Sequence, residues 1–141
     1  MNELLHIELA GCLVVDSAGR LLLIHRNYKG IVQWEVPGGK IHLGEIPADA
    51  ASREVFEELN ISVEPEKLLL ENKFSEYDHH YKYFVFLSSL GNQTPKITEN
   101  KFDKFGFLSL AELLKCKSEL SANMRLILDY IISNKYETAI R

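Results

Sequence analysis

Apolar residues recur along this chain at two different spacings, which predict a fold that mixes strands and helices. Residues 7–15 and 21–25 are nearly continuous apolar runs, and residues 81–87 combine aromatic with β-branched side chains. Runs of this length and composition are typical of β-strands. The Asp-Ser-Ala-Gly segment at 16–19 predicts a turn, so we expect the first two strands to form a hairpin.

Two segments have the three- and four-residue spacing of amphipathic helices. Within residues 47–59 the apolar stripe consists of Ala48, Ala51, Val55 and Leu59. Residues 121–134 repeat the pattern with Met124, Ile127, Leu128 and Ile131. Pro47 suits the first helical position, where its missing N–H costs nothing. A shorter helix is predicted after Ser109, because Ser109 and Glu112 have the spacing of a capping box.

The remaining segments predict extended chain and loops. Residues 61–63 and 67–74 alternate weakly between apolar and polar, and residues 102–107 are largely apolar, so we expect extended structure in all three. The predicted loops and turn regions are residues 25–30, 75–80 and 91–101.

Composition places the chain among ordinary globular proteins. Its 141 residues are 46% hydrophobic and 26% charged, so we expect one domain over residues 1–141. A net charge of -4 argues against stable nucleic-acid binding. The sequence lacks the pattern of a signal peptide or a membrane span, so we expect a cytoplasmic protein without a membrane partner. Cys12 and Cys116 give neither a disulfide framework nor a metal-binding spacing.

The helix predicted at 47–59 carries three glutamates that converge on one face. Glu54, Glu57 and Glu58 lie three or four positions apart, so their carboxylates repel one another. Arg53 lies four residues before Glu57 and can pair with one carboxylate, not three. The surplus charge predicts a bound cation, and oxygen ligands suit Mg²⁺, which keeps waters for a phosphate-bearing substrate. A solvated helix surface with charge pairs is the alternative.

Just before this helix, Pro37, Gly38 and Gly39 predict a tight turn. Pro37 fixes its own φ, and the two glycines leave backbone groups bare to a ligand. A peptide carbonyl of this turn could therefore add a neutral oxygen ligand to the acidic cluster. A plain turn without a ligand is the alternative.

Together these residues resemble the Nudix box of the Nudix hydrolase family. The resemblance is carried by Gly39, Glu45 and residues 53–61, Arg-Glu-Val-Phe-Glu-Glu-Leu-Asn-Ile. Asn60 stands where the family usually has glycine, and asparagine is the residue that best replaces glycine in a left-handed conformation. The resemblance implies an α/β sandwich, with a mixed sheet between the Nudix-box helix and a C-terminal helix.

The resemblance also implies a reaction, the hydrolysis of a nucleoside diphosphate linked to another group. By position, the metal ligands would be Gly38, Glu54, Glu57 and Glu58, holding Mg²⁺ or Mn²⁺. Glu54, Glu57 and Glu58 would also be catalytic, because one of them or a neighbouring acid would deprotonate the attacking water. Which carboxylate acts as the base varies within the family and stays open.

Four further residues receive roles from the resemblance. Arg53, also catalytic, would hold Glu57 in place, and Glu45 would brace the loop before the helix. Many relatives supply another acid just before the strand predicted at 102–107, which Glu99 or Asp103 could provide here. Both are equally natural as surface residues.

Residues near the box are candidates for substrate binding. Arg26 matches a basic residue that often faces the substrate phosphates in the family, and a solvated surface arginine is the alternative. Tyr28 and Trp34 could stack on a base, although a tryptophan where a strand enters a turn is more often a packing residue. Gly39 and Lys40 complete the predicted substrate-binding set.

Three functions follow as hypotheses. The first is a pyrophosphohydrolase of nucleoside triphosphates, including damaged or non-standard ones. The second is the same chemistry on nucleotide sugars, dinucleoside polyphosphates or capped RNA ends. The third is a nucleotide-sensing module without turnover, against which the intact acidic cluster argues. The sequence does not settle the oligomeric state, although relatives in the family are often dimers, so a homodimer is a further hypothesis.

Overall fold

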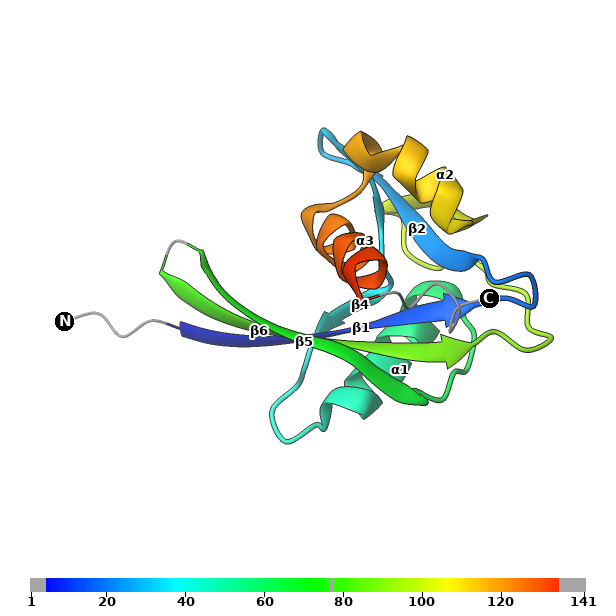
Figure 1. The fold of residues 1–141 in the computed structure, drawn as a ribbon. Coiled ribbons are helices and arrows are strands. Elements are labelled where there is room, and N and C mark those ends of the chain that lie inside the picture. The colour runs from blue at the N-terminus through cyan, green and yellow to red at the C-terminus, as the bar shows by residue number, and fades with distance from the viewer. Residues whose placement is uncertain (1–4, 77, 135–141) are drawn as a thin grey trace.

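The computed structural model describes residues 5–76 and 78–134, whose strands form one mixed sheet (Figure 1). Within these residues the seven strands are β1 (Leu5–Val15), β2 (Leu21–Tyr28), β3 (Ile31–Glu35), β4 (Gly38–Lys40), β5 (Lys67–Glu76), β6 (His79–Ser89) and β7 (Phe102–Leu108). Their order is β3-β2-β1-β6-β5, with β4 paired to β1 and β7 paired to β2. The β1–β6 pair is parallel and the other pairs are antiparallel.

Helices cover both faces of this sheet (Figure 1). They are α1 (Pro47–Leu59), α2 (Leu110–Lys115) and α3 (Ala122–Ser133), with a 3₁₀ turn at Lys117–Glu119 before α3. Successive side chains of a strand point to opposite faces. On β1, Ala10, Cys12 and Val14 therefore join the core beneath α1, whereas Leu13 joins the core beneath α2 and α3. The expected α/β sandwich is confirmed.

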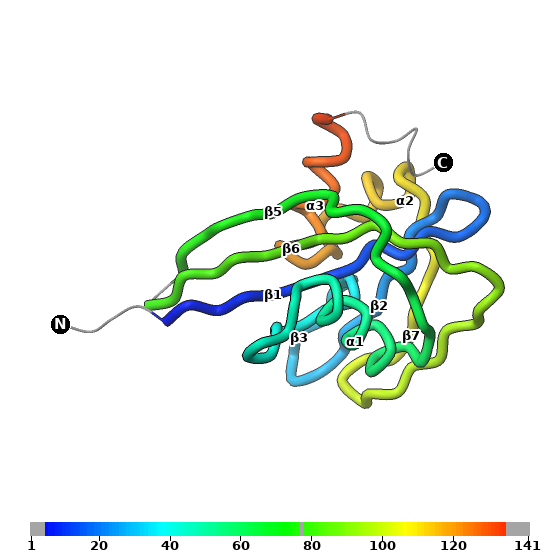
Figure 2. The backbone as a smooth tube through the Cα atoms, turned by 90° about the horizontal axis from the view of Figure 1, so that it is seen from below, coloured from blue at the N-terminus to red at the C-terminus, as the bar shows by residue number. Residues whose placement is uncertain are grey.

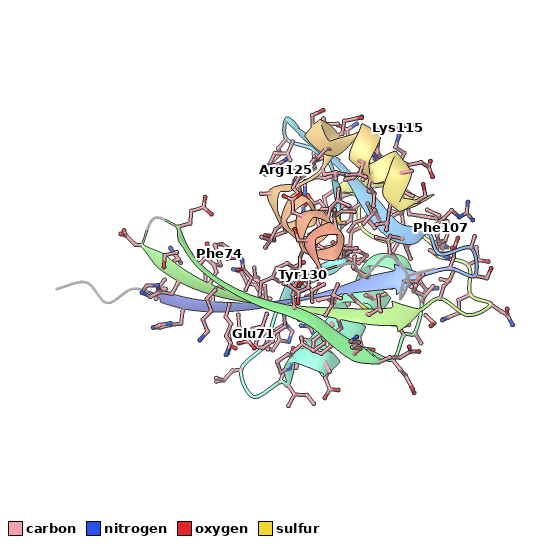
Figure 3. The ribbon with its side chains drawn as sticks, viewed as in Figure 1. Glu71, Phe74, Phe107, Lys115, Arg125 and Tyr130 are labelled. Carbon is pink, nitrogen blue, oxygen red and sulfur yellow. The ribbon has the colours of Figure 1, made fainter. Side chains whose placement is uncertain are left out.

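Three strands project beyond the helices as an arm, formed by the N-terminal part of β1 and the β5–β6 hairpin (Figures 1 and 2). In the register Leu5 lies beside His79, which pairs in turn with Glu76, so the strands end at one level. Phe74 and Glu71 project from opposite faces of β5, with Phe74 on the side of α3 (Figure 3). Residues of the arm and of α3, among them Phe74 and Leu126, line one cavity.

The strands predicted at 7–15, 21–25, 81–87 and 102–107 are all present, and each extends one or more residues beyond the prediction. The predicted turn at 16–19 is also present, with Gly19 at φ 76. The helix that closes the chain buries the four predicted residues Met124, Ile127, Leu128 and Ile131.

The capping box at the start of α2 is confirmed, since Ser109 and Glu112 exchange both hydrogen bonds. No helix of residues 5–76 and 78–134 is long and apolar enough to cross a membrane.

Two predicted loops are wrong. β2 continues to Tyr28, and the turn consists only of Lys29 and Gly30, at φ 51 and 82. Pairing with β3, in which Arg26 lies opposite Gln33, holds these polar residues in a strand despite their low β-propensity. In the second case the predicted loop at 75–80 is the end of the β5–β6 hairpin. Residue 77 of that loop lies outside the described residues.

Residues 61–63, predicted to be extended, are not a strand of the sheet. Ile61 and Val63 are buried in the core beneath α1 without belonging to the sheet. Their alternation with a polar residue therefore reflects packing against the helix.

The predicted Gly-Gly turn is wrong, because Gly38 and Gly39 lie in strand β4 and neither has a positive φ. Gly38 pairs with Gly11 of β1. A Cβ added to Gly38 would lie 2.4 Å from the Ala10 carbonyl oxygen. Glycine is therefore required here for a close approach of two backbones and not for a turn.

Helix α1 begins at Pro47 as predicted, but its buried stripe differs by one residue. Ala50 is buried with Ala51, Val55 and Leu59, whereas Ala48 is only half-buried. The stripe is thus shifted toward the side of the helix that faces β1.

The helix ends at Asn60, at φ 55 and ψ 35, with its N–H donated to the Phe56 carbonyl at 2.9 Å. The predicted left-handed conformation is confirmed.

We predict that Asn60→Ala lowers the free energy of unfolding by about 1 kcal/mol, because a left-handed conformation costs an ordinary side chain roughly that much. Asn60→Gly should be neutral or slightly stabilising. Urea unfolding of the three proteins measures the difference. Equal effects of alanine and glycine would contradict the prediction.

Candidate active site

Arg53 on α1 joins the loop before the helix to the acidic face of the helix. Its Nε and Nη2 donate to the two Glu45 carboxylate oxygens at 2.8 and 3.0 Å. Its Nη1 donates to Glu54 at 3.0 Å and to Glu57 at 3.2 Å. Nη2 also donates to the Lys40 carbonyl at 2.9 Å. Arg53 therefore pairs with three carboxylates and not with the one expected from the helix spacing. The bracing roles of Arg53 and Glu45 stay predictions.

The charges of this network stabilise one another. Hydrogen bonds from Arg53, followed by the His42 N–H, lower the pKa of Glu45 to about 2. The same ion pair raises the pKa of Arg53 above its ordinary value. The Glu45 carboxylate therefore stays ionised beside Arg53 at neutral pH.

The three glutamates of the cluster have different environments. Glu58 is 3% exposed, and its Oε1 accepts the Gly38 N–H at 2.8 Å. Burial raises the pKa of Glu58 to about 8, and the nearby charges of Glu54 and Glu99 add to the effect. The Glu57 side chain is 47% exposed. The three carboxylates therefore do not form one exposed face, although the helix spacing alone suggested that they would.

Glu54 lies directly over the second glycine of β4. A Cβ added to Gly39 would be 2.5 Å from the Glu54 carboxyl carbon. Burial is the main cause of a raised pKa of Glu54, which the Arg53 guanidinium partly offsets. The absence of a side chain at residue 39 is therefore what allows the Glu54 carboxylate to contact the β4 backbone.

Of the two further acids considered from the sequence, Glu99 is the one near the cluster. Its charge contributes to the raised pKa of both Glu54 and Glu58, and Lys101 pairs with it at 3.2 Å. Asp103 instead contacts His25 Nδ1 at 2.7 Å, away from the cluster.

The oxygen atoms of the cluster are of the type that a hard divalent cation binds. Their present arrangement, however, does not form a binding site. The Arg53 guanidinium bonds to both Glu54 and Glu57. Among the described residues no group of three or more His, Cys, Asp or Glu side chains is positioned to hold a metal ion as it stands. Burial raises the pKa of Glu54 and Glu58, so without a cation both groups keep a proton to higher pH than an exposed glutamate does. A divalent cation would favour the ionised carboxylates, whose oxygens are typical Mg²⁺ ligands.

None of the predicted substrate residues on β2 and β3 pairs with a glutamate of α1, although the charges of Glu58 and Glu99 act on Arg26. Arg26 binds the Glu35 carboxylate with two hydrogen bonds, from Nε at 2.5 Å and from Nη2 at 3.0 Å. Trp34 packs against the core beneath α3, with its ring edge-on to His25 at 4.8 Å between centroids. Tyr28 is exposed beside the Lys29 ammonium group. Stacking of Tyr28 or Trp34 on a base, and phosphate binding by Arg26, stay predictions.

A cavity of about 650 Å³ begins at the glycine strand and extends between the arm and α3. The residues that line it are Leu9, Gln33, Glu35, Val36, Gly38, Gly39, Asn72, Phe74, Glu76, Tyr81, Tyr83, Ser121, Ala122, Asn123 and Leu126. Sequence reasoning found only the two glycines of this set. The alternation within 31–35 places Gln33 and Glu35 on one face, and it could have predicted these two further lining residues.

Comparison with known proteins identifies the family of this chain. The family described as NUDIX domain matches residues 6–130. The chain is 45% identical over 62 residues to a MutT-like protein of Streptomyces ambofaciens, covering 44% of this chain and only 38% of that protein. It is 31% identical over 107 residues to Phosphatase NudJ of Escherichia coli O1:K1, covering 74% of this chain and 70% of that protein.

A solved structure agrees with the fold. The MutT protein from Methanosarcina mazei Go1 has a TM-score of 0.82 and 23% identity, covering 96% of this chain and 99% of that chain. The matched residues include the whole acidic helix, the glycine strand and the loop that Arg53 braces. The chain belongs to the Nudix hydrolase family.

Proposed function

We propose that this protein is a metal-dependent pyrophosphohydrolase that cleaves a nucleoside triphosphate to the monophosphate and pyrophosphate. The observation that carries the proposal is the position of the Glu54 carboxylate, which lies against Gly39, one of the residues that line the cavity. A nucleotide with its base in that cavity would have its phosphates beside the acidic cluster.

The cation would be held by Glu54, Glu57, Glu58 and the Gly38 carbonyl, with Glu99 as a further oxygen donor. When bound, Mg²⁺ or Mn²⁺ neutralises diphosphate oxygens and lowers the pKa of a coordinated water. Arg53 would position the glutamates, because its guanidinium fixes Glu54 and Glu57 from one side.

The proton from the attacking water needs an acceptor, and two carboxylates qualify. Glu54 and Glu58 both have a raised pKa. A carboxylate with a raised pKa is a stronger proton acceptor than an ordinary one. The choice between them is left to kinetics.

The size of the cavity favours a substrate with a single nucleoside. About 650 Å³ is within the range of roughly 300–1,000 Å³ that small-molecule sites occupy. A dinucleoside polyphosphate would need a place for its second base elsewhere on the surface. We therefore place triphosphates before the other substrates of this reaction class.

The test is product release from a panel of nucleoside triphosphates, nucleotide sugars, dinucleoside polyphosphates and capped RNA ends, each with Mg²⁺. We expect monophosphate and pyrophosphate from at least one triphosphate, and no turnover in EDTA. Turnover of none, with tight binding of one, would support a sensor in place of an enzyme.

We predict that Glu57→Gln keeps the fold and lowers turnover by more than the roughly 10–100-fold that loss of an outer metal-site partner causes. The variant should fold because the Glu57 side chain is 47% exposed. Steady-state kinetics and thermal unfolding measure the two effects. Glu64→Gln, an exposed change outside the cluster, is the control. Full activity of Glu57→Gln would argue against Glu57 as a metal ligand.

The two glycines of β4 should respond differently to alanine. In Gly39→Ala the three atoms nearest to the new methyl group all belong to the Glu54 carboxylate, which can move, so we expect a folded protein with little activity. In Gly38→Ala the methyl group meets the Ala10 backbone, so we expect a large loss of stability. Circular dichroism melts and turnover separate these results. An active Gly39→Ala protein would show that the position of Glu54 is not needed.

Stability without metal should fall as the pH rises. The pKa of Glu58 is about 8 in the folded protein, whereas the ordinary value for a glutamate is 4.5. Between these two pH values the folded state keeps a proton that the unfolded state has released. The stabilisation is complete below pH 4.5 and is lost as the pH rises to about 8. Urea unfolding in EDTA across this window should show a smaller pH dependence for Glu58→Gln. Identical slopes for both proteins would refute the assignment.

A further inference from the structure

The last turn of α1 ends against a segment of the loop before β7. The carbonyl groups of Glu57, Glu58 and Leu59 lie at the end of the helix, where no later turn of the helix donates to them. The Lys96 N–H donates to the Leu59 carbonyl at 2.8 Å, and the Thr98 N–H donates to the Glu58 carbonyl at 3.3 Å. The Thr98 hydroxyl donates to the Glu57 carbonyl. The segment from Lys96 to Thr98, the clamp, therefore gives each of the three carbonyls a donor.

The clamp has a fixed place in the fold. Ile97 at its centre is half-buried and packs against the core beneath α1. Directly after the clamp the chain turns into β7, where the Phe102 N–H donates to the Glu99 carbonyl at 3.2 Å. Glu99 is the residue that follows Thr98. Its backbone is therefore held between the clamp on one side and the start of β7 on the other.

The clamp holds Glu99 near carboxyl groups that repel it. The charge of Glu99 contributes to the raised pKa of both Glu54 and Glu58. In the ionised form that a divalent cation binds, these carboxylates repel one another. Lys101 pairs with Glu99 at 3.2 Å and offsets part of this repulsion. The hydrogen bonds of the clamp oppose the remainder, because they tie the loop to the helix that carries the other two carboxyl groups.

We infer that Thr98 is a positioning residue that holds Glu99 against the glutamates of α1 and so raises the affinity of the acidic cluster for a divalent cation. This inference rests on the proposed function for the use of Glu99 as an oxygen donor. Thr98 is central to the clamp because it donates twice, from its N–H and from its hydroxyl. The N–H is available in any residue except proline, whereas the hydroxyl requires threonine or serine in a side chain of this size.

The exposure of Thr98 separates this role from a contribution to stability. Because Thr98 is exposed, water can replace its hydroxyl as the donor to the Glu57 carbonyl. Loss of the hydroxyl should therefore change the free energy of unfolding little. A water molecule does not tie the loop to the helix, however, so Glu99 should be held less firmly beside Glu54 and Glu58.

The test is the binding of Mn²⁺ to the protein without nucleotide, measured by electron paramagnetic resonance of the free ion. Thr98→Val keeps the size and the N–H of the residue but lacks the hydroxyl. We expect it to bind Mn²⁺ more weakly by roughly two- to tenfold, the range expected for one hydrogen bond. Thr98→Ser keeps the hydroxyl and should bind as the unaltered protein does. Thr94→Val is the matched control, because Thr94 is exposed in the same loop outside the clamp.

Thermal unfolding of the same four proteins in EDTA completes the test. We expect similar melting temperatures, since the clamp acts on the cation site more than on the fold. Weaker Mn²⁺ binding by Thr98→Val alone, with its melting temperature unchanged, supports the inference. A melting temperature of Thr98→Val far below the other three overturns it in favour of a structural role.

The remaining outcomes separate this inference from the proposed function. Equal affinity of Thr98→Val and the unaltered protein overturns the inference, and so does an equal loss in Thr98→Ser or Thr94→Val. An unaltered protein that does not bind Mn²⁺ overturns it as well. A protein that binds Mn²⁺ but turns over no nucleotide refutes the proposed enzyme function, and the comparison of the variants still decides the role of Thr98.

Discussion

The structure of the site depends on one close approach, in which the glycine strand β4 lies against both β1 and the acidic helix. Gly38 has no room for a methyl group beside the Ala10 carbonyl, and Gly39 has none beside Glu54. The Gly38 N–H, brought near by this approach, is the one hydrogen-bond partner found for the Glu58 side chain among the described residues. A buried carboxylate without a hydrogen-bond partner is costly. The contact with the glycine strand therefore stabilises the acidic helix.

One helix gives its three glutamates three different chemical states. Glu58 faces the sheet and has a pKa of about 8, Glu54 is half-buried over the glycine strand, and Glu57 faces solvent. Arg53 binds the two outer carboxylates, and Glu45 holds Arg53 from the other side. The helix can therefore hold three carboxyl groups close together because Arg53 pairs with two of them and burial favours the protonated form of the third, Glu58.

The sequence was sufficient for features that depend on local spacing, and insufficient for features that depend on distant strands. The left-handed Asn60 followed from its place after a helix, because few residues tolerate that conformation. The conformation of Gly38 could not be predicted from the sequence. Only the pairing of Gly38 with β1 shows that glycine is required by the close approach of two strands and not by a turn. The ion pair of Arg26 with Glu35 was missed because it forms between β2 and β3, and residues 25–30 were predicted as a loop in place of the end of β2.

The parallel pairing of β1 with β6 has a consequence for how the chain folds. Residues Leu5 to Val15 lie beside His79 to Ser89 along the full length of both strands. The first strand therefore pairs with a strand about seventy residues further along the chain. Contacts between such distant segments slow folding because the chain between them must be ordered first. During synthesis, that edge of β1 stays unpaired until the hairpin of β5 and β6 has emerged. Premature association of that edge with other chains is then the main competitor of correct folding.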